Sequence, residues 1–181
     1  MIDQGLKLAS LLLILVLNGC AITSVNDDTG AQKLPRNSIG WSFQGKAAVT
    51  QANAKTNTVN LDWSRLEATR DQLRLSGPLG SGALELWRED EQLFWLDGGL
   101  QKPLETLPVD DEVVATLTTL PLNLISAWLM GYHDSTDGWQ VKITQWQVAG
   151  GWQLPRKIEA YRDDLSVRLV VLKWNLEALQ Q

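Results

Sequence analysis

From Ile39 onward, apolar and polar residues alternate along much of the chain with a period of two. Such a period is typical of β-strands that bury one face and leave the other in water. We therefore expect strand to follow strand, with turns at Asn, Asp, Gly and Pro residues. The predicted strands cover residues 41–50, 59–64, 72–76, 84–86, 92–96, 139–146, 157–162 and 165–174.

The period changes between residues 108 and 131, where two short helices are predicted. The acidic run 110–112 suits the N-terminus of the first helix, and Leu120-Pro121 interrupts the pattern. Pro121 fits the first turn of the second helix, and Gly131 fits its end. The apolar residues of the second helix recur at helical spacing: Leu122, Ile125, Trp128 and Leu129. Two helices inserted into an antiparallel sheet predict a mainly β fold whose curved sheet is covered on its concave side, around an apolar space.

The N-terminus has the features of a secretory leader. An apolar run over residues 8–17 follows the cation Lys7, and it is shorter than the about 20 residues that a membrane-spanning helix needs. It ends at Leu17-Asn18-Gly19-Cys20, which resembles the lipobox of bacterial lipoproteins. We expect residues 1–19 to be a signal peptide and Cys20 to carry lipid. Because Cys20 is the only cysteine, the mature chain offers no disulfide and no free thiol.

Residues 20–38 form the next segment, which is polar and has no apolar period. This composition predicts a flexible tether between the lipid and the folded part. The remaining residues, 39–181, are enough for one domain with a sizeable core.

The charge and the aromatic content limit the possible partners. A net charge of -5, without a cluster of Lys and Arg, argues against a nucleic-acid partner. The nine Trp residues stand out against two Phe and two Tyr. Trp joins a large apolar body to one N–H donor, so these residues suit core packing, lipid contact or sugar contact equally well.

The sequence contains no pattern that is typical of a catalytic or metal-binding site. His133, the only histidine, lies in a polar stretch and is predicted to be a solvated loop residue. Gly80-Ser81-Gly82 fits neither the nucleophile elbow nor a phosphate-binding loop. The acidic pairs at residues 110–111 and 163–164 suit a helix start and a hairpin tip better than paired catalytic acids. We therefore expect a binding protein without a cofactor or metal, and not an enzyme.

A leucine stands near the tip of a Gly- and Pro-rich turn. Leu79 lies between Pro78 and Gly80, at a position where turns normally carry polar residues. Its side chain either points out of the protein, towards something apolar, or folds back to plug the end of the sheet. The sequence leaves both possibilities open.

The ordered motifs of the whole chain resemble the LolB family, whose members are outer-membrane lipoproteins that receive other lipoproteins. No single motif is highly specific, but their order and spacing agree over nearly the whole length. The matching residues are Leu17–Cys20, Trp41 with Gly45, Leu61-Asp62-Trp63, Gly77-Pro78-Leu79-Gly80-Ser81 before Leu84-Glu85-Leu86, Leu120-Pro121-Leu122 with Trp128 and Gly131, Gly138-Trp139, and Leu154-Pro155.

This resemblance implies a half-open β-barrel whose helix-covered cavity holds the acyl chains of a client lipoprotein. The client would arrive from LolA, a periplasmic carrier of similar fold, and leave for the inner leaflet of the outer membrane. Pro78 and Leu79 match the family's membrane-insertion loop. The resemblance also implies a monomer that is lipid-anchored in the outer membrane and faces the periplasm.

The inward positions of the predicted strands and the second helix give the candidates for the cavity wall. The same residue types would serve a plain core, so about half of them are expected to be simple packing. The candidates are Phe43, Ala47, Val49, Val59, Leu61, Trp63, Leu73, Leu75, Leu84, Leu86, Leu122, Ile125, Trp128, Leu129, Val141, Ile143, Val167 and Leu169.

The chain departs from the family at Tyr132–Asp137, where members usually carry a longer stretch with another strand or hairpin. The expected barrel therefore has fewer strands or a wider mouth. Two other functions also fit the sequence. A carbohydrate- or peptidoglycan-binding lipoprotein would show a flat exposed row of Trp, and a structural outer-membrane assembly lipoprotein would have a filled interior.

Overall fold

A computed structural model describes residues 31–51, 56–77, 83–90, 92–108, 122–133 and 137–179. Several predicted features lie outside these residues. They are the signal peptide, the lipidated Cys20, most of the tether, the loop with Pro78 and Leu79, and the first helix of the 108–131 segment.

The described residues form one ten-stranded sheet, one α-helix and one turn of 3-10 helix. All eight predicted strands are confirmed. The strands are β1 (Gln32–Lys33), β2 (Trp41–Gln51), β3 (Asn57–Glu67), β4 (Arg70–Ser76), β5 (Leu84–Glu89), β6 (Gln92–Asp97), β7 (Leu100–Pro103), β8 (Gln140–Ala149), β9 (Trp152–Arg162) and β10 (Leu165–Asn175). The helices are η2 (Leu104–Thr106) and α3 (Leu122–Leu129).

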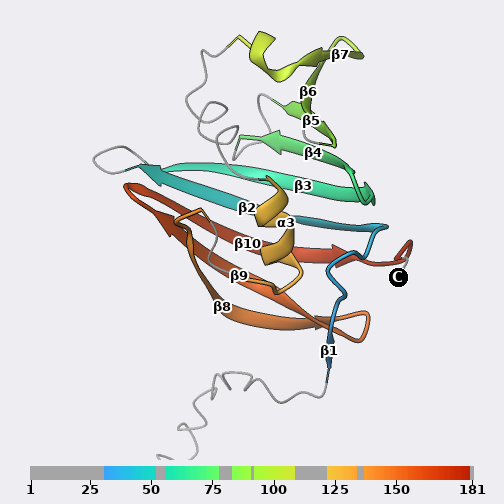
Figure 1. Ribbon diagram of the computed structural model, residues 1–181, viewed down its shortest axis with the longest axis vertical. Coiled ribbons are helices and arrows are strands. Elements are labelled where there is room, and N and C mark those ends of the chain that lie inside the picture. The colour runs from blue at the N-terminus through green and yellow to red at the C-terminus, as the bar shows by residue number, and fades with distance from the viewer. Residues whose placement is uncertain are drawn as a thin grey trace, which may run out of the picture.

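The sheet is curved and open, as predicted. Its strands follow the order β1-β9-β10-β2-β3-β4-β5-β6-β7. Outside this order, β8 pairs with β9 along the edge that faces away from β10. Within the described residues, β7 and β8 are edge strands that do not pair with each other, so the sheet does not close into a full barrel. Figure 1 shows α3 lying across one face of the sheet, in front of β2 and β10.

The predicted tether is too long by several residues. β1 already belongs to the sheet, where it pairs in parallel with the start of β9 through Gln32 and Trp152. β10 pairs with β9 only from Leu165 to Val170, so β1 takes the place that β10 leaves. Leu34 is completely buried. A single buried leucine in a polar stretch produces no apolar period, which is why the pattern did not reveal it.

β7 was not predicted either. It forms a hairpin with β6 through Gly98 and Gly99, which both have positive φ angles, 58° and 86°. Glycine adopts such angles without the steric cost that a Cβ brings. Because β7 has four residues and ends in a proline, it shows no clear alternation.

The second predicted helix is confirmed as α3. Ile125, Trp128 and Leu129 are buried beneath it, so its apolar stripe faces the sheet. The helix ends at Leu129 and is followed by Gly131, which has a φ of 86°. The Gly131 N–H donates to the Trp128 oxygen and the Tyr132 N–H to the Ala127 oxygen, each over 2.9 Å. This pair of bonds is the glycine-dependent helix end expected from the sequence.

The chain passes from α3 to β8 by a short connection. The described residues 130–133 and 137–139 contain no strand, and a turn at Asp137-Gly138 leads into β8. Among the described helices, none has the length and apolar character needed to cross a membrane.

Candidate functional site

A small apolar cavity lies between α3 and the inner face of the sheet. Its volume is about 20 Å³, which is room for about one water molecule. All eight residues that line it belong to the predicted wall, and each has an aliphatic side chain. They are Ala47, Leu61, Leu73, Leu75, Leu86, Leu122, Ile125 and Leu169.

The strand period explains why these residues meet. On β4, Leu73 and Leu75 point inward, and each stands opposite an inward leucine of β5, Leu86 and Leu84 respectively. The same alternation brings Ala47 of β2 and Leu61 of β3 to the inner face. From the other side, α3 closes the space with Leu122 and Ile125. The cavity is therefore a narrow gap under the helix and not an open hollow.

The other ten predicted wall residues do not line this cavity. Seven of them are buried in the surrounding core: Phe43, Val49, Val59, Trp63, Trp128, Leu129 and Val167. Three are partly buried and pack against that core: Leu84, Val141 and Ile143. The structure thus places these ten in the packing around the gap.

An aromatic cluster fills the inner face next to the cavity. Trp41, Phe43, Trp63 and Trp174 form five ring pairs whose centroids lie 5.4–6.5 Å apart. The indole N–H of Trp41 donates to the Ser38 backbone oxygen over 3.0 Å. The four rings stabilise this end of the sheet, because aromatic pairs add attraction beyond the area that they bury.

A buried ion cluster continues the same face beyond the aromatic rings. Asp71 has no exposed side-chain surface and accepts hydrogen bonds from the Nε atoms of Arg65 and Arg88, over 2.8 and 2.7 Å. The three residues stand directly opposite one another on β3, β4 and β5. Removal of charge from water is costly unless the groups are paired, and here two cations share one anion.

This ion cluster was not predicted, although the sequence contains a signal for it. Each member continues the inward period by two residues: Arg65 follows Trp63, Asp71 precedes Leu73 and Arg88 follows Leu86. Charged residues of opposite sign at inward positions of neighbouring strands indicate a buried ion pair.

The C-terminal end of α3 is held by the N-terminal strap, which we define as residues 32–36. The Oη of Tyr132 donates to the Leu34 oxygen over 3.2 Å, and the Arg36 guanidinium lies 4.5 Å from the centre of the Tyr132 ring. The ammonium of Lys33 lies 5.4 Å from the Trp146 ring of β8. These contacts fix one end of the helix, whereas the cavity lies under the other end.

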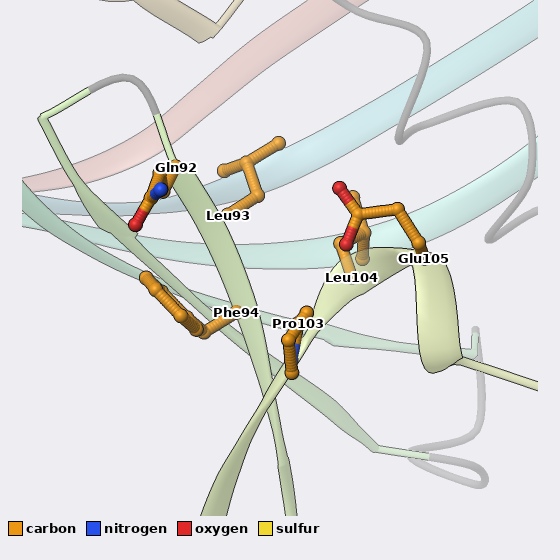
Figure 2. Close-up of a pocket in the computed structure, with 6 residues that line it drawn as sticks. All are labelled: Gln92, Leu93, Phe94, Pro103, Leu104 and Glu105. Atoms are coloured by element: carbon orange, nitrogen blue, oxygen red, sulfur yellow. The ribbon is translucent and has the colours of Figure 1, made fainter.

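A second pocket lies at the β7 edge of the sheet. Figure 2 shows Gln92 and Phe94 of β6 across from Pro103 and Glu105. Its volume is about 280 Å³, and Leu93 and Leu104 complete its wall. Because the wall carries an amide and a carboxylate, this pocket lacks the continuous apolar contact that was predicted for the acyl-chain site.

The tryptophans do not form the exposed row that a sugar-binding surface requires. Trp41, Trp63, Trp128, Trp139 and Trp174 are buried. The other four, Trp87, Trp95, Trp146 and Trp152, are half-buried. The carbohydrate-binding alternative is therefore not favoured.

Other candidate chemistry has no support in the described part of the chain. His133 is exposed, as predicted for a solvated loop residue. No group of three or more His, Cys, Asp or Glu residues is placed to hold a metal ion among the described residues.

An open, curved sheet with one short helix over the aliphatic side chains of its inner face defines the structural class of this chain. The chain belongs to the LolB family: the family model described as "Outer membrane lipoprotein LolB" matches residues 40–174. It is accordingly an outer-membrane lipoprotein, as the resemblance implied.

Two relatives by sequence agree with this family assignment. The chain is 30% identical over 190 residues to the outer-membrane lipoprotein LolB of Shewanella loihica, covering 90% of this chain and 84% of the relative. It is 26% identical over 192 residues to the LolB protein of Halorhodospira halophila, covering 93% of this chain and 94% of the relative. Among solved structures, a LolA superfamily protein from Nitrosomonas europaea matches with a TM-score of 0.47 and 10% identity, covering 82% of this chain and 90% of that chain.

Proposed function

We propose that this protein accepts acylated lipoproteins from a LolA-like periplasmic carrier and transfers them to the inner leaflet of the outer membrane. The observation that carries the proposal is the all-aliphatic gap between the inner face of the sheet and α3, in a chain of the LolB family. The protein would act as a monomer, anchored through lipid on Cys20, with residues 1–19 removed.

The energy of lipid transfer explains why such a protein needs an apolar interior. At about 0.8 kcal/mol per buried methylene, one acyl chain of about 15 methylenes represents about 12 kcal/mol. A client with three chains carries about three times that amount. Transfer is fast only if carrier, receptor and membrane offer similar apolar contact, so that no step requires the chains to enter water. The function needs no covalent step.

The cavity must enlarge before an acyl chain can enter, because a volume of about 20 Å³ holds no more than a fragment of it. The part of α3 that lines the cavity is its N-terminal half, with Leu122 and Ile125. The other end is held by the contact of Tyr132 with the N-terminal strap. We therefore propose that α3 swings outward about its C-terminal end when a client binds.

A transfer assay tests the receptor function directly. The unlipidated protein is mixed with a complex of carrier and labelled client lipoprotein, and the client is followed by its co-elution with either protein. We expect transfer to the wild type and reduced transfer to Ile125→Ser, which places a hydroxyl in the cavity wall. Val148→Ser, at a position 54% exposed on β8, is the matched control. No transfer to the wild type would rule out the receptor function.

The loop with Pro78 and Leu79 lies outside the described residues, and its role remains a proposal. An exposed leucine would enter the membrane surface and assist release of the client. We expect Leu79→Glu to take up the client almost normally but to release it poorly into liposomes. Equal loss of uptake and release would argue against this role.

A further inference from the structure

Two buried indole groups of the aromatic cluster have no hydrogen-bond partner. The Nε1 atoms of Trp63 and Trp174 are both buried and unpaired, whereas that of Trp41 in the same cluster donates to Ser38. An indole nitrogen can only donate a hydrogen bond, and a buried one normally finds an acceptor. An unpaired buried donor is costly, so each such group calls for an explanation.

The two indoles belong to one row across the inner face of the sheet. Phe43 on β2 stands opposite Trp63 on β3 and opposite Trp174 on β10. The ring of Phe43 lies 6.3 Å from the Trp63 ring and 5.4 Å from the Trp174 ring. The two indole rings that carry the unpaired donors therefore flank the same phenylalanine.

This row adjoins the aliphatic cavity. Trp63 stands opposite Leu73, which lines the cavity. Leu61, another lining residue, precedes Trp63 by two positions on β3, a distance of about 7 Å along the strand. A ligand whose apolar chain occupied the enlarged cavity would thus have its next atoms at the aromatic row.

Beyond the aromatic row, the inner face continues with the guanidinium groups of the buried ion cluster. Arg65 follows Trp63 on β3, and the carboxylate of Asp71 is already bound by Arg65 and Arg88. Along the inner face, the aliphatic cavity residues are followed by the aromatic row with its unpaired N–H groups, and the row is followed by the guanidinium groups. This order matches an acyl ester, which has an apolar chain followed by a carbonyl oxygen that only accepts hydrogen bonds.

We propose that Trp63 and Trp174 form a carbonyl-binding subsite, in which their indole N–H groups donate to the ester carbonyl oxygens that join the acyl chains to a client. This proposal rests on the proposed receptor function and extends it from the apolar tails to the polar linkage. The subsite would set how deeply the chains enter, because the carbonyl groups stop at the aromatic row.

The test compares two synthetic lipopeptides with identical chains, one joined by esters and the other by alkyl ethers. The wild type should bind the ester form more tightly, by about fivefold for each hydrogen bond formed. In the complex with the wild type, the infrared carbonyl band of a ¹³C-labelled ester should lie at a lower frequency than in the complex with a variant that lacks both donors. Trp63→Phe with Trp174→Phe keeps two rings but removes both donors, so the preference should disappear.

Trp139→Phe is the matched control, because the Nε1 of Trp139 is also buried and unpaired but its ring packs edge-on against Trp128 of α3 and not in the row. This variant should keep the ester preference. Equal affinity of the wild type for both lipopeptides would overturn the subsite, and this comparison decides the question even if the double variant fails to fold. Binding of neither lipopeptide would overturn the receptor function instead.

Discussion

The side chain of Tyr132 donates a hydrogen bond from its Oη to the backbone oxygen of Leu34, 3.2 Å away. These residues are 98 positions apart in the sequence, and the bond joins the end of α3 to the N-terminal strap. The strap lies between the expected lipid anchor at Cys20 and the first long strand, β2. The helix that covers the cavity is thus attached to the segment that leads to the membrane.

Tyr132→Phe should loosen this attachment. The change removes one hydrogen bond, worth about 1 kcal/mol, while the ring remains beneath Arg36. We expect faster hydrogen–deuterium exchange of the α3 amides, measured by mass spectrometry. Tyr161→Phe is the control, because the Tyr161 hydroxyl bonds Glu159 on an exposed surface. Exchange in α3 that is the same in both variants would show that the strap does not hold the helix.

Gly131→Ala should destabilise the protein by more than the backbone conformation alone explains. Gly131 has a φ of 86°, and a Cβ there would lie 3.0 Å from the Trp146 ring. Gly151 has a similar φ of 83° but no atom within 4 Å of the Cβ position. The backbone strain of an alanine at either site costs about 1 kcal/mol. Urea unfolding should therefore show a larger loss for Gly131→Ala than for Gly151→Ala, and equal losses would mean that Trp146 moves aside freely.

The period of the sequence was sufficient to predict most of the sheet and α3. It was sufficient because both are long enough to repeat an apolar position several times. β1 and β7 were not predicted because strands of two and four residues are too short to show a repeated apolar position. Leu34 was not predicted because it is a single buried leucine in a polar stretch.

The candidate site was predictable only in part, for a related reason. Alternation identifies which strand side chains point inward and helical spacing does the same for α3, and together they predicted all eight cavity residues, six on strands and two on the helix. It does not reveal how closely α3 approaches the sheet, which decides whether an inward residue such as Val59 lines a gap or fills the core. The Asp71 cluster was not predicted, because a period defined by apolar residues leaves out charged side chains at inward strand positions.

Asp71→Asn should be strongly destabilising. The carboxylate is completely buried between Arg65 and Arg88, so its loss leaves two cations without an anion, and such changes cost about 3–5 kcal/mol. Asp97→Asn is the control, because the Asp97–Lys102 pair is about half exposed and worth at most about 1 kcal/mol. Urea unfolding of both variants checks this difference. A small loss of unfolding free energy for Asp71→Asn would show that water or a rearrangement of the side chains solvates the two unpaired guanidinium groups.

Leu61→Ala should make stability depend more strongly on bound lipid. Leu61 is 5% exposed and lines the cavity, so its truncation should cost about 2–5 kcal/mol in the empty protein. An acyl chain in the cavity would occupy part of the vacated space, so an acylated peptide should raise the melting temperature of this variant more than that of the wild type. Val59→Ala is the matched control, since Val59 is equally buried on the same strand but does not line the cavity. If the peptide raised the melting temperatures of both variants equally, the acyl chain would not lie beside Leu61, and the assignment of this cavity as the lipid site would be wrong.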